Sequence, residues 1–186
     1  MLSLAAFTFA ATPATAQNRG SVGGQAGVTF QSETATVFAG EFTVRLAPVA
    51  EIYGSVGRMQ DAMPSEIQDI LNFVDSSLNA SVPALYGISG VRLGLSEGSV
   101  RPYGIAGAGL AHLAGKFEYA GRDITSLVED EIGYSLTSTE FAFELGGGVI
   151  IPAGAKAFID TGYRYMRITG SDMNVSRVYG GFGVRF

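Results

Sequence analysis

The sequence predicts an all-β protein, an eight-stranded antiparallel up-and-down transmembrane β-barrel with short helices in two long extracellular loops. Eight segments of about ten residues alternate apolar and polar side chains, the pattern of strands with one apolar face. Only 16 % of the 186 residues are charged, and only Lys116 and Lys156 are lysines, whereas a water-exposed surface needs roughly a quarter or more. Both observations favour a barrel whose apolar face meets lipid.

The expected strands follow one another along the chain with turns between them. They span residues 21–31, 36–47, 49–59, 84–95, 100–118, 138–151, 155–168 and 175–186. The connections at Ala47-Pro48, Ser96-Glu-Gly98 and 152–155 are tight, whereas those at 60–83 and 119–137 are long. Short turns therefore fall at one end of the predicted barrel, and the long loops fall at the other.

Both long loops carry helical patterns. In the first, over residues 65–79, the capping box Ser65-Glu-Ile-Gln68 introduces one apolar face, made of Ile67, Ile70, Leu71, Val74 and Leu78. In the second, over residues 123–132, Asp123 is expected to cap a short helix that brings Ile124, Leu127 and Val128 together. Acidic residues at 129–131 oppose the dipole of that helix, so it should be weak. The two apolar faces could bury in each other, on the barrel rim or on a ligand.

Residues 1–16 have the character of a cleaved signal peptide, which leaves 17–186 as the barrel domain. This segment is apolar and uncharged, and Ala14-Thr-Ala16 has the small-x-small form of a cleavage site. The usual basic region is missing, since no Lys or Arg precedes Arg19, so we expect the natural start further upstream. No later run is long enough for an apolar spanning helix.

Alternation alone does not tell which face is inside, because a soluble lipocalin-like barrel would turn its apolar face inward around a ligand. The charges decide for a transmembrane barrel. The polar faces carry five acidic residues and five arginines: Glu41, Glu51, Glu140, Glu144, Asp160, Arg45, Arg92, Arg164, Arg177 and Arg185. Such balance suits charges that are enclosed and paired, since unpaired buried charge is costly. We therefore expect a lumen network of Glu41, Arg45, Glu51, Arg92, Glu140, Glu144, Asp160, Arg164 and Arg177 that leaves no open pore.

The remaining charge is concentrated in the loops. Ten acidic residues, accompanied there by Arg122, fall in the connections at the long-loop end: Glu33, Asp61, Glu66, Asp69, Asp75, Asp123, Glu129, Asp130, Glu131 and Asp172. The formal net charge of −5 argues against nucleic acid as a partner, because phosphate binding needs clustered Lys and Arg. The absence of cysteine excludes a disulfide scaffold and a thiolate metal site.

The chain ends within an alternating strand, on Tyr179-x-Gly181-x-x-Val184-x-Phe186. Together with the signal segment, the eight strands and the unequal loops, this ending resembles that of small eight-stranded outer-membrane β-barrel proteins of Gram-negative bacteria, such as the outer-membrane protein A barrel and the opacity-type, porin-like proteins. The resemblance implies that the four named residues form an assembly signal read by the barrel-assembly machinery. It also implies outer-membrane lipids and lipopolysaccharide as partners, and we expect a monomer.

The sequence lacks Trp, which is usual in the aromatic girdles of these barrels. Tyrosines at 53, 103, 163 and 165, together with phenylalanines, are expected to form the girdles instead. Arg58 and Arg167 end two strands on the lipid-facing parity near the long loops. We expect them to contact lipopolysaccharide head groups, with pairing to Asp61 or Asp172 as the alternative.

No catalytic site, cofactor or metal is expected. His112 is the only histidine and should fall near Glu144 if the strands at 100–118 and 138–151 pair, but no serine accompanies it. The segment Gly107-Ala-Gly109 begins like a dinucleotide loop, but it lies within a strand and lacks a third glycine. The chain is thus predicted to be a structural, adhesive or surface-interaction protein, with hydrophobic small-molecule binding or transport at the barrel mouth as the alternative.

Overall fold

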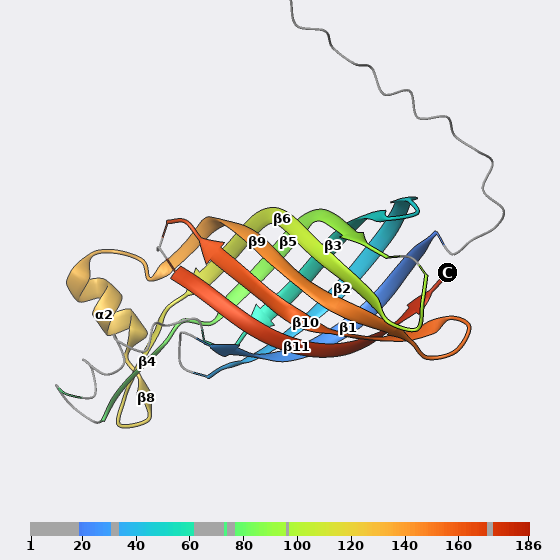
Figure 1. Cartoon of the computed structure of the whole chain (residues 1–186). Helices are drawn as coiled ribbons and strands as arrows, with labels where there is room; N and C mark the ends of the chain where they lie inside the picture. The colour runs from blue at the N-terminus through green and yellow to red at the C-terminus, as the bar shows by residue number, and fades with distance from the viewer. Residues whose placement is uncertain (1–18, 31–33, 62–72, 74–76, 96, 171–172) are drawn as a thin grey trace, which may run out of the picture.

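The protein is a closed antiparallel β-barrel, and a small module of strands and one helix projects from one end of it (Figure 1). The structure is a computed structural model, and it describes residues 19–30, 34–61, 73, 77–95, 97–170 and 173–186. The predicted signal peptide and most of the first predicted loop helix, including its capping box, lie outside these residues. No helix in the described part of the chain combines the length and the hydropathy that crossing a membrane would require.

Eight strands form the barrel, each hydrogen-bonded to its neighbours in sequence. They are β1 (Gly20–Phe30), β2 (Thr36–Ala47), β3 (Ala50–Met59), β5 (Ala84–Gly94), β6 (Arg101–Ala114), β9 (Thr137–Pro152), β10 (Ala157–Ile168) and β11 (Met173–Arg185). This order confirms the predicted up-and-down barrel. The predicted strand at 100–118 is too long, because β6 ends at Ala114 and the residues beyond Gly115 join a second sheet.

The last strand closes the barrel by pairing with the first. The register of β1 and β11 runs from Ser21 opposite Arg185 to Phe30 opposite Ser176. The pairing extends to the chain end, since the Arg19 amide donates to the Phe186 carbonyl at 2.8 Å and the Phe186 amide donates to the Gly20 carbonyl at 3.0 Å. Closure pairs the backbone N–H and C=O groups of the two edge strands, because unpaired groups would be costly in the hydrocarbon of a membrane.

The outer face of the barrel is predominantly apolar. Phe42, Phe141 and Phe182 are exposed, whereas Glu144 and Arg164 are completely buried. This inside-out arrangement decides against the lipocalin-like alternative, in which the charged side chains would face water.

The predicted placement in the aromatic girdles is wrong for two of the four tyrosines. Tyr53 and Tyr103 are buried in the lumen, because they share the inward parity of Glu51 and Ser55 and of Arg101 and Ile105. Tyr163 and Tyr165 lie on the outer face, where their hydroxyls hydrogen-bond Ser176 and Asn174.

The interior has an apolar layer that the sequence analysis did not identify. Toward the long-loop end, buried side chains of several strands form one cluster. It includes Val37, Met59, Leu113, Met166, Ile168, Met173 and Val175. Polar side chains therefore fill the middle of the barrel, and apolar side chains fill the part above it.

The lumenal tyrosines fit because inward-facing glycines lie beneath them. The pairs are Tyr86 with Gly57, Tyr103 with Gly148, Tyr179 with Gly162, and Tyr53 with Gly107. A methyl group on Gly57 would lie 2.3 Å from the Tyr86 hydroxyl oxygen and 2.8 Å from the Phe38 carbonyl oxygen. These glycines provide the space that a narrow barrel needs to hold large rings.

We predict that Gly57→Ala destabilises the barrel by about 1–3 kcal/mol through overpacking against Tyr86. Gly87→Ala is the matched control, because Gly87 faces outward and a methyl group there would meet nothing within 4 Å. Urea unfolding in lipid vesicles measures both variants. Equal stabilities would show that the ring does not need the space above Gly57.

Candidate functional site

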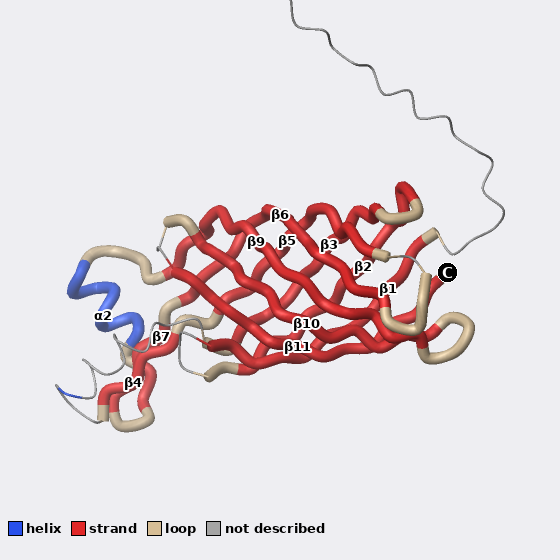
Figure 2. The backbone as a smooth tube through the Cα atoms, viewed as in Figure 1, coloured by secondary structure: helices blue, strands red, loops and turns tan. Residues whose placement is uncertain are grey.

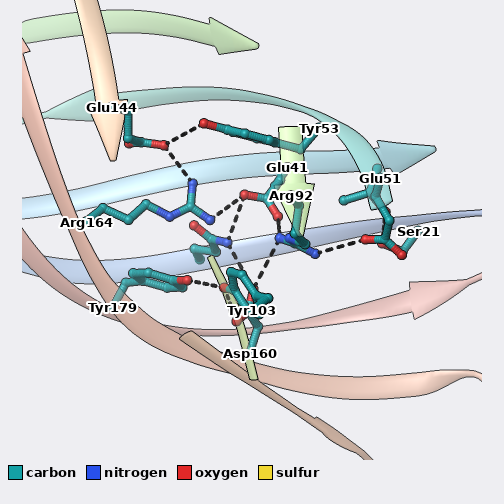
Figure 3. A network of polar contacts seen from close by, with 12 residues as sticks. Ser21, Glu41, Glu51, Tyr53, Arg92, Tyr103, Glu144, Asp160, Arg164 and Tyr179 are labelled. Atoms are coloured by element: carbon teal, nitrogen blue, oxygen red, sulfur yellow. Dashed lines mark hydrogen bonds and ion pairs between the residues drawn. The ribbon is translucent and has the colours of Figure 1, made fainter. Parts of the chain in front are cut away.

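The middle of the lumen is occupied by a cross-barrel ion-pair network (Figure 3). Glu41 on β2 accepts from Arg92 on β5 and from Arg164 on β10. Glu144 on β9 accepts from Arg164 at 3.1 Å and from Arg177 on β11. Two carboxylates thus bridge three guanidinium groups that come from opposite walls, so these side chains cross the lumen.

The network continues toward the short-turn end through Glu51. Arg92 lies 3.6 Å from Glu51 and 3.8 Å from Asp160, and Arg45 lies 3.5 Å from Glu51. Eight of the nine predicted lumen charges therefore join one connected array. Glu140 is the exception: it lies half-buried near the long-loop end against Gly170, and no ion pair connects it to the array within the described residues. On β9, Glu140 lies two residues before Ala142. This position is closer to the long-loop end of the barrel than the polar layer is.

Tyrosines and a glutamine complete the coordination of these charges. Tyr103 donates to Asp160 at 2.6 Å and also contacts the Tyr179 hydroxyl. Tyr53 donates to Glu144 at 3.4 Å, and the Gln25 amide lies 3.4 Å from both Glu41 and Asp160. With these residues, every barrel strand contributes to the array.

Ring faces add a second kind of contact to the arginines. The Arg92 guanidinium lies 4.4 Å from the Tyr103 ring centre, and Arg164 lies 4.7 Å from that of Tyr179. Arg177 lies 4.8 Å from the Tyr86 ring and donates to its hydroxyl. Such stacking suits Arg, which is planar and weakly hydrated. The tyrosines could have been identified from the sequence, because they share the parity of the polar residues on their strands.

Beyond the barrel, the two long loops combine into a small module (Figure 2). It consists of β4 (Leu78–Ser81), β7 (Lys116–Tyr119), β8 (Arg122–Asp123) and α2 (Thr125–Ile132). β4 pairs with β7, and a turn with positive φ at Ala120 and Gly121 connects β7 to β8. Leu78, predicted in a helix, therefore lies in a strand, because its segment pairs with the other loop.

The helix of the module begins slightly later than predicted. Its N-cap residue is Ile124, not Asp123, but the Asp123 carboxylate accepts from the Thr125 amide at 2.9 Å. These hydrogen bonds from Thr125 lower the pKa of Asp123, so it carries its charge at neutral pH. Glu129 in the last turn accepts from the Leu136 amide at 2.7 Å, which holds the following loop against the helix. Gly133 ends α2 in the left-handed conformation with φ of 71°.

The module exposes large apolar side chains among its acidic residues. Leu127 is 67 % exposed and Tyr134 is 77 % exposed. The predicted burial of the α2 apolar face is therefore only partial. Acidic residues at 129–131 lie between these two side chains in the sequence.

His112 does not lie near Glu144. It points outward near the end of β6, opposite Thr139, and its Nδ1 lies 3.0 Å from the Thr139 hydroxyl. Glu144 lies opposite Gly107 and points into the lumen. The prediction failed because the strand pairing places His112 and Glu144 at different levels and on opposite faces of the wall.

Arg58 and Arg167 both lie on the outer face, one residue before the ends of β3 and β10. Arg58 is two strands from His112 in one cross-strand row, with Leu85 between them. Arg167 lies between Phe143 and Asn174. No group of three or more possible metal ligands occurs within the described part of the chain.

The four residues of the predicted assembly signal divide between the two faces of β11. Val184 and Phe186 are exposed on the outer face. Tyr179 and Gly181 face inward, where a methyl group on Gly181 would lie 2.3 Å from the Gly24 carbonyl oxygen of β1. The glycine therefore permits close approach at the closing seam.

Comparisons with solved structures agree with this architecture. The attachment invasion locus protein Ail of Yersinia pestis is 16 % identical with a TM-score of 0.56, over 90 % of this chain and 96 % of that chain. Neisserial surface protein A is 12 % identical with a TM-score of 0.57, over 90 % and 96 %. A major outer membrane protein from Thermus thermophilus is 11 % identical with a TM-score of 0.59, over 90 % and 99 %. At these identities the likeness shows the fold alone.

No curated protein sequence is detectably similar to this chain. The model of one protein family, however, matches residues 1–186, the whole chain. That match and the structural neighbours place the protein in the bacterial outer membrane. The chain belongs to the family of the outer membrane protein beta-barrel domain.

Proposed function

We propose that the protein is a closed, monomeric, non-catalytic barrel that acts at the cell surface through its extracellular module. The observation that carries the first half of this proposal is the ion-pair network, which spans the lumen from wall to wall. An eight-stranded barrel is narrow enough for side chains to fill it. The apolar cluster above the network supports closure as well, and because its side chains are already packed together, it does not favour a hydrophobic-ligand conduit.

The module supports the second half of the proposal. Apolar side chains that remain exposed among polar ones are typical of protein interaction surfaces. The acidic groups around Leu127 and Tyr134 favour a basic partner. One structure of Ail contains a heparin analogue, sucrose octasulfate. A polyanion of that kind would be repelled by the acidic module of this chain.

A further proposal concerns the insertion of the barrel into the membrane. The C-terminal strand, with Tyr179, Gly181, Val184 and Phe186, acts as the signal for the barrel-assembly machinery. Removing the Phe186 ring should then reduce the amount of barrel inserted in cells, but not refolding of the purified chain into detergent. Equal insertion in cells would contradict this role.

We predict that Glu144→Gln destabilises the barrel by about 3 kcal/mol or more, because Arg177 then lacks a buried counter-charge and Arg164 keeps only Glu41. Glu140→Gln on the same strand is the matched control. Glu140 is outside the array, so its substitution should cost less than about 1 kcal/mol. Unfolding by urea in lipid vesicles measures both.

Planar lipid bilayer recordings test closure directly. The wild-type barrel should give no large, steady conductance, because its lumen is filled. A steady open channel in the wild type would contradict the closed barrel, whatever the stability of the variants.

We predict that Arg58→Gln/Arg167→Gln weakens co-purification of lipopolysaccharide. Both guanidinium groups lie on the lipid-facing wall near the long-loop end, where they can bind phosphate in a bidentate fork. Lys156→Gln, at the opposite end, is the control. Unchanged lipid content in a double variant that still shifts on heating in SDS gels would favour pairing within the chain instead.

We predict that Asp130→Asn/Glu131→Gln/Tyr134→Ser lowers adherence of bacteria that display the barrel to a surface coated with a basic polypeptide. A tenfold loss of affinity corresponds to about 1.4 kcal/mol, which the removal of two charges and one ring can supply. Glu97→Gln, exposed at the short-turn end, is the control. Undiminished adherence at equal surface amounts would exclude this part of the module as the contact.

A further inference from the structure

A small cavity lies inside the barrel at the end with the short turns, which is the periplasmic end in barrels of this kind. Its volume is about 40 Å³, enough for a few water-sized groups. Four guanidinium groups and a single carboxylate are among its lining side chains, namely Arg45, Arg92, Arg101, Arg185 and Glu51. We call this cavity the periplasmic vestibule.

Two of the four arginines have their charge compensated. Arg92 contacts Glu41, which lies deeper in the barrel, and it lies 3.8 Å from Asp160. Arg45 and Arg92 also share Glu51, at 3.5 and 3.6 Å. The carboxylates near the vestibule are therefore already engaged.

Arg101 and Arg185 are not compensated in this way. Within the described residues, neither lies within 4.0 Å of a carboxylate. Arg101 donates from Nε to the Gly98 carbonyl at 3.2 Å, and Arg185 lies 5.1 Å from the ring centre of Phe158. Arg101 and Arg45 repel Arg185, and the attraction of Glu51 is weaker than either repulsion. Two half-buried positive charges thus face one small space whose lining carboxylate, Glu51, is paired with Arg45 and Arg92.

We propose that the periplasmic vestibule binds a phosphate group between Arg101, Arg185 and Arg45. A phosphate carries negative charge and several acceptor oxygens, which match guanidinium forks. The group could belong to inorganic phosphate or to the head group of an inner-leaflet phospholipid. The second source is sterically possible because the exposed side chains of Val49 and Leu95 also line the vestibule.

The experiment uses the full barrel refolded in a detergent without phosphate groups. Isothermal titration calorimetry with inorganic phosphate, at constant ionic strength, should show saturable binding. Arg101→Gln/Arg185→Gln should lower the affinity at least tenfold, about 1.4 kcal/mol. Arg122→Gln, in the extracellular module, should not change it. Arg101→Lys keeps the charge without the fork, so it should have an intermediate affinity.

A parallel titration with a short-chain phosphatidylglycerol, below its micelle concentration, distinguishes the two sources. Binding of inorganic phosphate supports the free anion, and binding of the lipid alone supports the head group. If the double variant does not refold, Arg101→Gln alone, remote from the chain end, replaces it. The proposal is overturned if neither ligand binds saturably, if chloride binds equally well, or if Arg101→Gln leaves binding unchanged.

Discussion

The bridging of three arginines by Glu41 and Glu144 is the interaction on which the rest of this barrel depends. Each carboxylate accepts from two guanidinium groups, and the arginine on β5 lies across the lumen from the two on the adjacent strands β10 and β11. Because a buried charge is costly without a partner, the barrel is stable only when all of these strands are in register. The array therefore fixes the register as well as filling the interior.

The requirements of this array explain other features of the wall. Large tyrosines surround the arginines, and inward glycines on neighbouring strands make room for them. The outer face needs only apolar bulk, since lipid supplies no specific partner. Specificity is thus concentrated inside the barrel, while the outside is a generic membrane surface.

The array is almost neutral, so the charge at each end of the barrel comes from the residues at its rim. The two ends therefore differ in chemistry. Acidic residues predominate in the extracellular module, whereas Arg101 and Arg185 lie uncompensated in the periplasmic vestibule. The charge array lies between these two surfaces, so each end can bind partners of its own charge preference. This separation is consistent with action at the surfaces and not through the interior.

The sequence by itself determined the strand number, the outward apolar face and the enclosure of charge, because a period of two assigns each side chain to a face. It also brought Glu41, Glu144 and the buried arginines into one expected network. Only the tertiary structure decided which charges meet, since axial level depends on register: Glu140 lies above the array, and His112 lies far from Glu144 on the other face. The pairing of the two loops, which turned Leu78 from a helix into a strand, likewise depends on contacts between distant segments that local periodicity does not contain.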